Sequence, residues 1–264
     1  MKFYQLLTEA SQYIIPQLYK QRFFKKQNQL SRENIISRKV EPELLWLTEF
    51  LPKDAVFIDV GANVGHFIYQ LEYHLFPQNI YAFEPNKSLN RKLKRLFPKV
   101  NLFSVALSDE NTVAEFKIPV LKGEKVNSRG TLQVDFHEEN EEKFVIEKVK
   151  VVKLDDFEPL KNLKKLDFIK IDVEGNEMKT LRGAKETILK FKPILMVEME
   201  QRHHKEPLWS LISEVESSGF TANYLDRETF NLKKLIEEFI NSQDAVFVKN
   251  KKNYINNIIN KRRK

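Results

Sequence analysis

Short apolar segments that end in a carboxylate recur along this chain, and longer helical segments separate them. The four clearest of these segments end at Asp59, Glu84, Asp172 and Glu198. Strands that alternate with helices are typical of a parallel sheet with helices on both faces. Right-handed crossovers place the carboxyl ends of such strands at one edge of the sheet, where open α/β sheets bind ligands. We therefore expect the four acids to lie on one rim.

Hydrophobic periodicity and turn residues predict the order of the elements. Strands are expected over residues 55–60, 79–83, 100–105, 166–171, 194–198, 221–225 and 245–248, with antiparallel or edge strands over 113–118 and 144–152 around a polar insertion. Helices are expected over residues 3–20, 41–51, 65–76, 87–97, 177–191 and 208–218, with Asn86 as an N-cap. The chain thus divides into an N-terminal helical extension (1–50), a central α/β domain (51–249) and a basic C-terminal tail (250–264).

Composition excludes several classes of protein. The chain has no cysteine, which excludes disulfide scaffolds, thiolate metal sites and a cysteine nucleophile. Its 264 residues are 42 % hydrophobic, which excludes disordered and fibrous classes. No apolar run approaches the ~18 residues of a spanning helix, and the N-terminal segment is too polar for a secretory signal. We expect a soluble, cytoplasmic protein.

The positive charge is concentrated at the two ends of the chain. The formal net charge is +7, and residues 249–264 hold seven basic side chains and no acid. Residues 1–40 hold eight basic and two acidic side chains, so the central part is acidic. Basic ends can bind nucleic acid or anionic lipid, or they can simply be solvated. The apolar and aromatic N-terminal helix is open to four roles: a lid, a dimer contact, a membrane contact or packing on the core.

A glycine turn follows the first expected strand of the sheet. Gly61 and Gly65 allow the chain to turn sharply and to approach a ligand closely. Their G-x-x-x-G spacing matches neither the dinucleotide fingerprint nor a phosphate-binding P-loop. A carboxylate at Asp59, beside the turn, repels a pyrophosphate and attracts an ammonium or a sulfonium. These features disfavour an oxidoreductase, although an ordinary strand–helix turn could have the same pattern.

Glu84 ends the second strand, 25 residues after Asp59. An acid at about this distance binds the ribose diol in nucleotide-binding parallel sheets, although a surface acid is the simpler alternative. A nucleoside that carries a charged amino acid arm and no phosphate fits both acids. S-adenosyl-L-methionine is such a molecule, and we expect it to be the cofactor.

Five segments together resemble the FkbM family of S-adenosylmethionine-dependent methyltransferases: D-V-G-A-N-V-G, F-E-P, V-A-L-S-D, L-D-F-I-K-I-D-V-E-G-N-E and L-R-G-A, within residues 57–200. The resemblance implies a class I methyltransferase (Rossmann-like) fold for residues 51–249. This fold is a three-layer sandwich around a mostly parallel, seven-stranded sheet whose last strand is antiparallel. The resemblance also implies methyl transfer to an oxygen, often a hydroxyl of a sugar or polyketide.

The cofactor contacts that the resemblance implies follow the first four strands: Asp59, Gly61, Ala62, Asn63, Gly65, Glu84, Pro85, Asn86, Ala106, Leu107, Ser108 and Asp172. Asp59, Gly61 and Asn63 would hold the methionyl end. Glu84 would bind the ribose, and the residues from Ala106 to Ser108 would lie near the adenine. The segments N-S-R-G-T-L-Q and V-E-M-E-Q-R-H-H fit the family only loosely.

Methyl transfer to a hydroxyl needs a group that removes the proton of that hydroxyl. The candidates are Asp172, Glu174, His203 and His204, and Lys170 could orient the acceptor. Structural alternatives exist for several of them, because Asp172 could cap a turn, Lys170 could form an ion pair and the histidines could be exposed loop residues. No spacing requires a metal, although Asp172, Glu174 and Glu198 together could hold Mg²⁺.

The sequence therefore predicts an O-methyltransferase that acts on a small molecule or a glycan. One alternative is an RNA methyltransferase that binds phosphates through the basic tail and Arg22, Lys25 and Lys26. The chain lacks the N-P-P-Y type of segment used for amino groups, so a nucleic-acid partner is not expected. Another alternative is a non-catalytic scaffold with the same fold. Peripheral membrane contact through the basic ends is also open.

Overall fold

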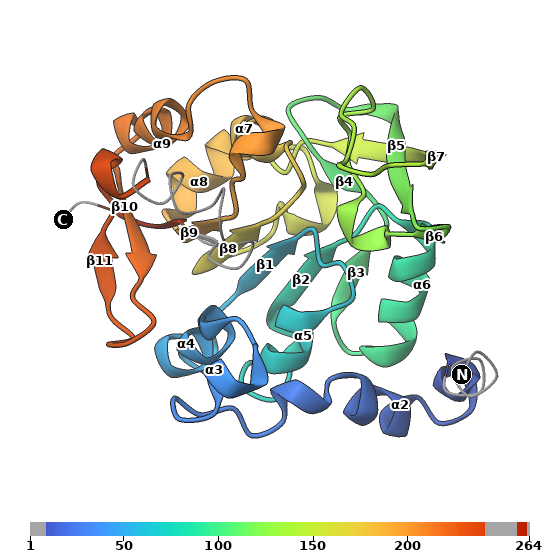
Figure 1. The fold of residues 1–264 in the computed structure, drawn as a ribbon. Coiled ribbons are helices and arrows are strands. Elements are labelled where there is room, and N and C mark those ends of the chain that lie inside the picture. The colour runs from blue at the N-terminus through green and yellow to red at the C-terminus, as the bar shows by residue number, and fades with distance from the viewer. Residues whose placement is uncertain (1–8, 241–257, 263–264) are drawn as a thin grey trace.

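The computed structural model describes residues 9–240 and 258–262. A twisted central sheet lies between two layers of helices, and a smaller second sheet adjoins one end of it, as Figure 1 shows. The expected α/β class with a mostly parallel sheet is confirmed. No helix in the described ranges is both long enough and apolar enough to cross a membrane.

Within the described residues the central sheet has eight strands, against the predicted seven, in the order β11-β10-β12-β9-β8-β1-β2-β3. The strands are β1 (Phe57–Val60), β2 (Ile80–Phe83), β3 (Asn101–Phe103), β8 (Phe168–Ile171), β9 (Ile194–Val197), β10 (Phe220–Leu225), β11 (Leu232–Lys234) and β12 (Ile258–Arg262). The pairs from β3 through β9 are parallel, whereas β12 runs antiparallel to both β9 and β10. The eighth strand is β11, which pairs antiparallel with β10.

Strand β12 belongs to the segment that the sequence predicted as a basic tail. Residues 258–262 pair with β9 and β10 inside the sheet, so this part of the chain is not a free extension. The strand predicted over residues 245–248 lies outside the described residues. The basic residues of this segment indicated a tail, whereas Ile258 and Ile259 were the apolar residues that could have indicated a strand.

Three helices cover each face of the sheet. One face carries α4 (Pro42–Phe50), α5 (His66–Leu71) and α6 (Lys87–Leu96), and the other carries α7 (Glu177–Gly183), α8 (Lys185–Phe191) and α9 (Leu208–Ser217). The predicted N-cap is confirmed, because the Asn86 side chain accepts hydrogen bonds from the backbone N–H groups of Ser88 and Leu89. Helix α5 is shorter than the predicted 65–76.

The helix predicted over residues 177–191 is broken in two at Ala184. Gly183 packs so closely on a neighbouring loop that a Cβ there would lie 1.8 Å from the Ser108 carbonyl oxygen. The start of α8 is capped from a distant loop, because the Asp155 carboxylate accepts hydrogen bonds from the N–H groups of Glu186 and Thr187. Both contacts are long-range, so local periodicity did not reveal the break.

The polar insertion and its flanking strands form a second sheet. Its strands are β4 (Ala106–Leu107), β5 (Thr112–Leu121), β6 (Glu124–Lys125) and β7 (Lys143–Val152), in the order β4-β7-β5-β6. The antiparallel pairing of β5 with β7 confirms the prediction for this region. The strand predicted over residues 100–105 ends at Phe103, and the chain then crosses to the second sheet.

The N-terminal extension forms an outer layer over α5 and α6 (Figure 1). Residues 9–14 are helical, and α2 (Pro16–Phe23) follows a break at Ile15, since the residue before a proline avoids the helical conformation. A short helix, α3 (Ile35–Arg38), precedes α4. The inner side of the extension is buried, with the ring of Phe24 stacked on Tyr69 at 4.4 Å.

Replacing Gly183 by alanine tests the packing of α7. Helix propensity alone would make this change stabilising by about 1 kcal/mol. Because the added methyl group would meet the Ser108 carbonyl, we instead expect the free energy of unfolding to fall by roughly 1–3 kcal/mol. Urea unfolding followed by circular dichroism measures the change. The exposed Ser210→Ala in α9 is the control, expected within ~0.5 kcal/mol of wild type. A gain in stability for Gly183→Ala would contradict this packing.

Candidate functional site

The glycine turn brings the ends of β1 and β8 into direct contact. Gly61 has φ +82°, and a Cβ at this position would lie 1.8 Å from the Asp172 carbonyl oxygen. Gly65 has φ +92°, and its Cβ would lie 2.8 Å from the side chains of Leu93 and Phe97. Both positions therefore require glycine, and the turn lies closely against the strand that carries the catalytic candidates.

A buried lysine joins the two strand ends below the turn. The Lys170 ammonium lies 3.2 Å from an Asp59 carboxylate oxygen and 3.3 Å from an Asp172 carboxylate oxygen. It also donates a hydrogen bond of 2.9 Å to the Gly61 carbonyl. Burial disfavours the charged lysine, but Asp59, Asp172 and Glu198 together raise its pKa above the usual value. The structure thus places Lys170 in an ion-pair network.

Asp59 is the buried partner of Lys170 and lies outside the pocket that is described below. Its side chain is fully buried, and it does not line the pocket. Burial raises the pKa of Asp59, and the neighbouring Lys170 opposes the shift. Its position fits a role in fixing the charge and place of Lys170.

Glu84 is a buried carboxylate at the end of β2. Its two oxygens accept hydrogen bonds from the backbone N–H groups of Asn63 (2.7 Å) and Asn86 (2.8 Å). Burial raises its pKa from 4.5 to about 7, although these two hydrogen bonds favour the ionised form. The surface-acid alternative for Glu84 is wrong, because 5 % of the residue is exposed.

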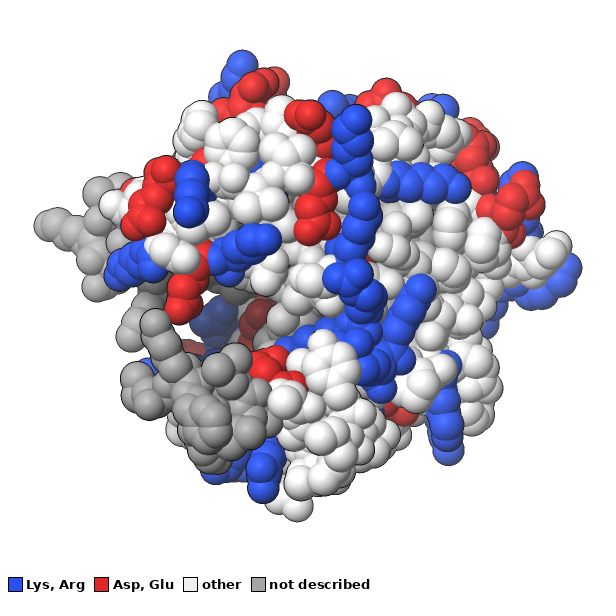
Figure 2. Space-filling model, turned by 90° about the vertical axis from the view of Figure 1, so that its right-hand side faces the viewer, with Lys and Arg blue, Asp and Glu red and all other residues white. Residues whose placement is uncertain are grey.

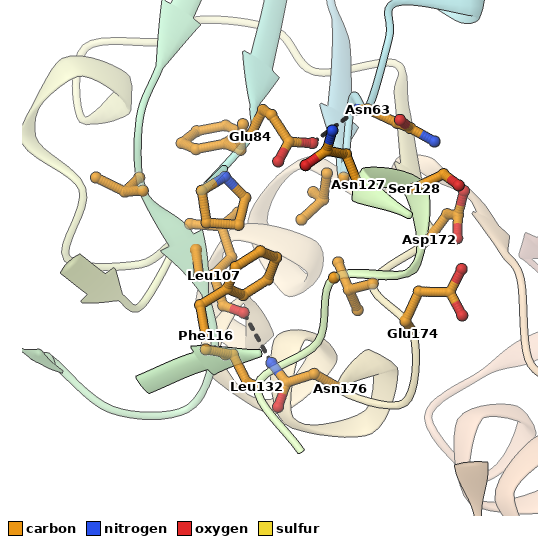
Figure 3. A pocket seen from close by; sticks show the side chains of 18 residues that line it. Asn63, Glu84, Leu107, Phe116, Asn127, Ser128, Leu132, Asp172, Glu174 and Asn176 are labelled. Atoms are coloured by element: carbon orange, nitrogen blue, oxygen red, sulfur yellow. Dashed lines mark hydrogen bonds between the residues drawn. The ribbon is translucent and has the colours of Figure 1, made fainter. Parts of the chain in front are cut away.

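A pocket opens along the rim between the two sheets, with about 560 Å³ of empty space that includes open solvent. Figure 3 shows Glu84 and Asn63 at one end, and Asp172 and Glu174 beside each other at one side. Eighteen described residues line it: Val60, Gly61, Asn63, Phe83, Glu84, Pro85, Val105, Ala106, Leu107, Phe116, Asn127, Ser128, Gly130, Leu132, Asp172, Val173, Glu174 and Asn176. This set contains three carboxylates and no lysine or arginine.

The polar insertion forms one wall of the pocket, which the sequence analysis missed. Asn127, Ser128, Gly130 and Leu132 all line the cavity. The Asn86 side chain donates a hydrogen bond of 3.0 Å to the Asn127 side-chain oxygen, which ties this wall to the end of β2. The signal in the sequence was Gly130, one of seven glycines in the chain. A Cβ at Gly130 would lie 2.4 Å from the Phe116 ring.

The loop after β8 holds Glu174 in a strained backbone conformation. Its φ is +52°, a region that non-glycine residues rarely occupy. The Thr131 hydroxyl donates to the Glu174 carbonyl at 2.7 Å. One carboxylate oxygen of Glu174 lies 2.9 Å from an Arg202 guanidinium nitrogen and 2.9 Å from His203 Nε2. Burial raises the pKa of Glu174, while His203 and Arg202 oppose the shift.

The two histidines after β9 differ in position. His203 is buried beside Glu174, so the expectation of an exposed loop residue is wrong for it. The His204 side chain is also mostly buried, and its Nε2 lies 3.2 Å from a Glu177 carboxylate oxygen. His204 does not line the pocket, whereas His203 touches a residue that does.

The predicted site residues thus fall into two groups. Seven of the predicted cofactor residues line the pocket: Gly61, Asn63, Glu84, Pro85, Ala106, Leu107 and Asp172. Five others do not line it: Asp59, Ala62, Gly65, Asn86 and Ser108. Of the catalytic candidates, Asp172 and Glu174 line the pocket, whereas Lys170, His203 and His204 do not.

A second acidic residue beside Glu174 was also missed. Glu138 is buried, and its carboxylate pairs with Arg202 at 2.6 Å and with Arg129 at 2.9 Å. Within the described ranges, Glu138, Glu174 and His203 have ligand atoms close enough to converge on a metal ion. This set differs from the predicted Asp172, Glu174 and Glu198. Because the Arg202 guanidinium already neutralises two of its members, the arrangement fits an ion-pair network.

Comparison with protein families gives one match that covers the site. The family described as Methyltransferase FkbM domain matches residues 59–232. The match begins at Asp59 and includes every residue that lines the pocket.

Individual proteins show weaker similarities. A 63-residue segment is 40 % identical to the AMB antimetabolite synthetase AmbE of Pseudomonas aeruginosa, and it covers 22 % of this chain and 3 % of that protein. A solved methyltransferase FkbM from Methylobacillus flagellatus is 15 % identical with a TM-score of 0.45, over 68 % of this chain and 42 % of that one. A TehB-like SAM-dependent methyltransferase from Corynebacterium glutamicum is 9 % identical with a TM-score of 0.44, over 88 % and 94 % of the two chains.

The raised pKa of Glu84 predicts how stability depends on pH. The pKa of Glu84 is higher in the folded protein than in the unfolded chain. Its contribution to the free energy of unfolding is therefore complete below about pH 4.5 and is lost as the pH rises through 7. Glu84→Gln stays neutral, so we expect its loss of stability between pH 5 and pH 8 to be smaller than that of wild type by roughly 2–3 kcal/mol. Urea unfolding at both pH values measures the difference. Glu115→Gln, at an exposed position in β5, should retain the wild-type pH dependence; equal slopes for Glu84→Gln and wild type would refute the assignment.

Proposed function

We propose that this chain, which belongs to the FkbM methyltransferase family, transfers a methyl group from S-adenosylmethionine to a hydroxyl oxygen of a sugar, a glycan or a related metabolite. The family match and the eight-stranded α/β sheet support the methyltransferase assignment. The cofactor, the oxygen and the class of acceptor are inferences from the site.

The charge of the pocket carries this proposal. Three carboxylates and no cationic side chain occur among its described lining residues. Phosphate groups would be repelled by such a wall, whereas a ligand with a positive centre and free hydroxyl groups would be attracted. S-adenosylmethionine combines a sulfonium, an ammonium and a ribose diol.

Each end of the pocket suits a different part of this cofactor. Glu84 has a fixed carboxylate that can accept hydrogen bonds from a ribose diol. Asp172 and the backbone of the glycine turn suit the charged amino acid end. The apolar side chains of Leu107, Phe116 and Leu132 offer a surface for the adenine. This distribution agrees with the roles that the family resemblance implies.

Asp172 and Glu174 lie beside each other in the pocket wall (Figure 3), and their different surroundings indicate different roles. Asp172 forms an ion pair with Lys170, so its charge is fixed close to the turn. Glu174 has a raised pKa and is held by His203 and Arg202. A base is most effective when its pKa approaches the working pH. We therefore assign proton removal from the acceptor to Glu174, and contact with the cofactor to Asp172.

The cofactor, when bound, supplies a methyl group activated by the adjacent sulfonium. The protein then has to position the acceptor and to remove its proton, because an alcohol is a weak nucleophile while it keeps that proton. Glu174 can accept the proton at the carboxylate oxygen that neither Arg202 nor His203 contacts. The need for such a base favours an oxygen acceptor, since a neutral amine can attack without prior loss of a proton.

Two further acids in the surroundings of Asp172 have raised pKa values. Burial, followed by the neighbouring Glu43, raises the pKa of Glu41 to about 7, and Asp172 contributes to the same shift. Burial and Asp172 also raise the pKa of Glu198 well above its usual value. Among the described residues, neither Glu41 nor Glu198 lines the pocket, so these shifts characterise the acidic surroundings of Asp172.

Glu174→Gln separates the chemistry from cofactor binding. The amide keeps the shape of the side chain but cannot take a proton, so we expect the methyl-transfer rate to fall about 10²–10⁴-fold. The affinity for S-adenosylhomocysteine, measured by calorimetry, should stay within about threefold of wild type. Asp172→Asn should instead weaken that affinity. Glu158→Gln, at an exposed site, is the control, and wild-type transfer by Glu174→Gln would exclude Glu174 as the base.

His203→Ala tests how Glu174 is tuned. The hydrogen bond from His203 lowers the pKa of Glu174, so its removal should raise that pKa. The acidic limb of the pH–rate profile should therefore move to higher pH, while S-adenosylhomocysteine affinity is retained. A lower rate with no movement of the limb would show that His203 has a structural role only.

A further inference from the structure

We propose that the outer side of the N-terminal extension binds the surface of an anionic membrane. This outer side, called the N-terminal surface below, consists of the exposed apolar residues Tyr13, Ile14, Ile15, Leu18 and Phe23. The proposal concerns where the protein acts and is independent of the methyl-transfer site, because none of the described residues of the extension (9–50) lines the pocket.

The N-terminal surface is apolar where a water-exposed helix would be polar. Ile14 is 80 % exposed and Tyr13 is 67 % exposed, and the other three residues are between 38 % and 51 % exposed. They lie within residues 13–23, which comprise the end of the helical segment 9–14 and all of α2. A contiguous exposed apolar patch of this kind indicates a partner or a membrane interface.

The opposite side of the same segment is firmly attached to the protein. Tyr19 and Phe24 are buried in the core that contains α5 and α6. The Lys20 ammonium forms a buried ion pair of 2.6 Å with Glu72. The apolar side chains of the N-terminal surface therefore cannot turn inward without breaking these contacts, and they stay directed at the solvent.

Positive charge surrounds the N-terminal surface. Residues 10–32 contain five basic side chains and no acid, and the three exposed ones nearest the patch are Arg22, Lys25 and Lys26. Helix α6, which packs against α2, also has five basic residues and no acid. Glu9 does not add a free negative charge, because it pairs with Lys92 at 3.6 Å.

The cations and the apolar groups form one continuous surface. The Arg95 guanidinium lies over the Tyr13 ring at 4.2 Å, and the Lys92 ammonium lies over the Phe23 ring at 4.4 Å. Figure 2, which views the side that carries α6, shows a band of Lys and Arg side chains above a largely uncharged area. Apolar groups that enter the interface, flanked by cations at the level of the headgroups, are typical of helices that lie on anionic bilayers.

Other partners fit this surface less well. RNA would use the cations but would leave Ile14 and Ile15 in water. A second copy of this chain, docked through the same surface, would bring two sets of cations together. An anionic bilayer satisfies the apolar and the basic groups at the same time.

Vesicle co-sedimentation of the full chain tests the proposal. We expect binding to vesicles of phosphatidylcholine with 30 % phosphatidylglycerol, weak binding to pure phosphatidylcholine, and a loss of binding as salt is raised. Ile14→Ser/Leu18→Ser should lower the partition coefficient at least tenfold. Arg22→Glu should lower it about fivefold or more, the effect of roughly 1 kcal/mol per basic side chain. S-adenosylhomocysteine affinity should be unchanged in both variants.

Leu189→Ser/Lys190→Glu is the matched control, since it removes an exposed apolar side chain and a cation from α8, on the opposite face of the sheet. It should bind vesicles as wild type does.

The proposal is overturned if wild type does not prefer anionic vesicles, or if Ile14→Ser/Leu18→Ser binds them normally. Retention of RNA that is insensitive to Ile14→Ser/Leu18→Ser, without vesicle binding, would assign the cations to nucleic acid instead. A dimer in light scattering that this variant abolishes would assign the patch to self-association.

Discussion

The site depends on the ion pairs of one buried lysine. Lys170 forms ion pairs with Asp59 and Asp172 and donates a hydrogen bond to the Gly61 carbonyl, so a single ammonium fixes the end of β8, the end of β1 and the glycine turn. Without this ammonium, the fully buried Asp59 carboxylate would carry a desolvation cost of several kcal/mol. The pocket above this network is lined by two further acids, Glu84 and Glu174. The proposed function rests on this acidic wall, which would attract a cationic nucleoside and repel a phosphate.

The local features of the fold and of the site could be predicted from the sequence. Short, continuous apolar segments indicated the parallel strands, because a strand that is buried on both faces of a sheet is apolar along its whole length. The acids at Glu84 and Asp172 were located by their place at strand ends, and Asn86 was identified as a cap by residue type alone. The FkbM resemblance then assigned these positions to a cofactor, and the class I methyltransferase fold that it implied agrees with the sheet.

The features that the sequence did not reveal depend on contacts between distant segments. Asp59 was expected in the pocket, but its partner Lys170 lies 111 residues away and holds it underneath. The wall formed by Asn127 and Leu132 follows from the folding of the insertion into a second sheet. The Glu138–Arg202–Glu174 network also joins three separate loops. Pattern and spacing along the chain contain no signal for such pairings.

The most direct test of this account is a crystal structure of the protein with S-adenosylhomocysteine. The account predicts that the nucleoside lies in the pocket between the two sheets, with its ribose hydroxyls hydrogen-bonded to the Glu84 carboxylate and its amino acid end beside Asp172. A nucleoside bound elsewhere on the protein, or a ribose turned away from Glu84, would contradict it.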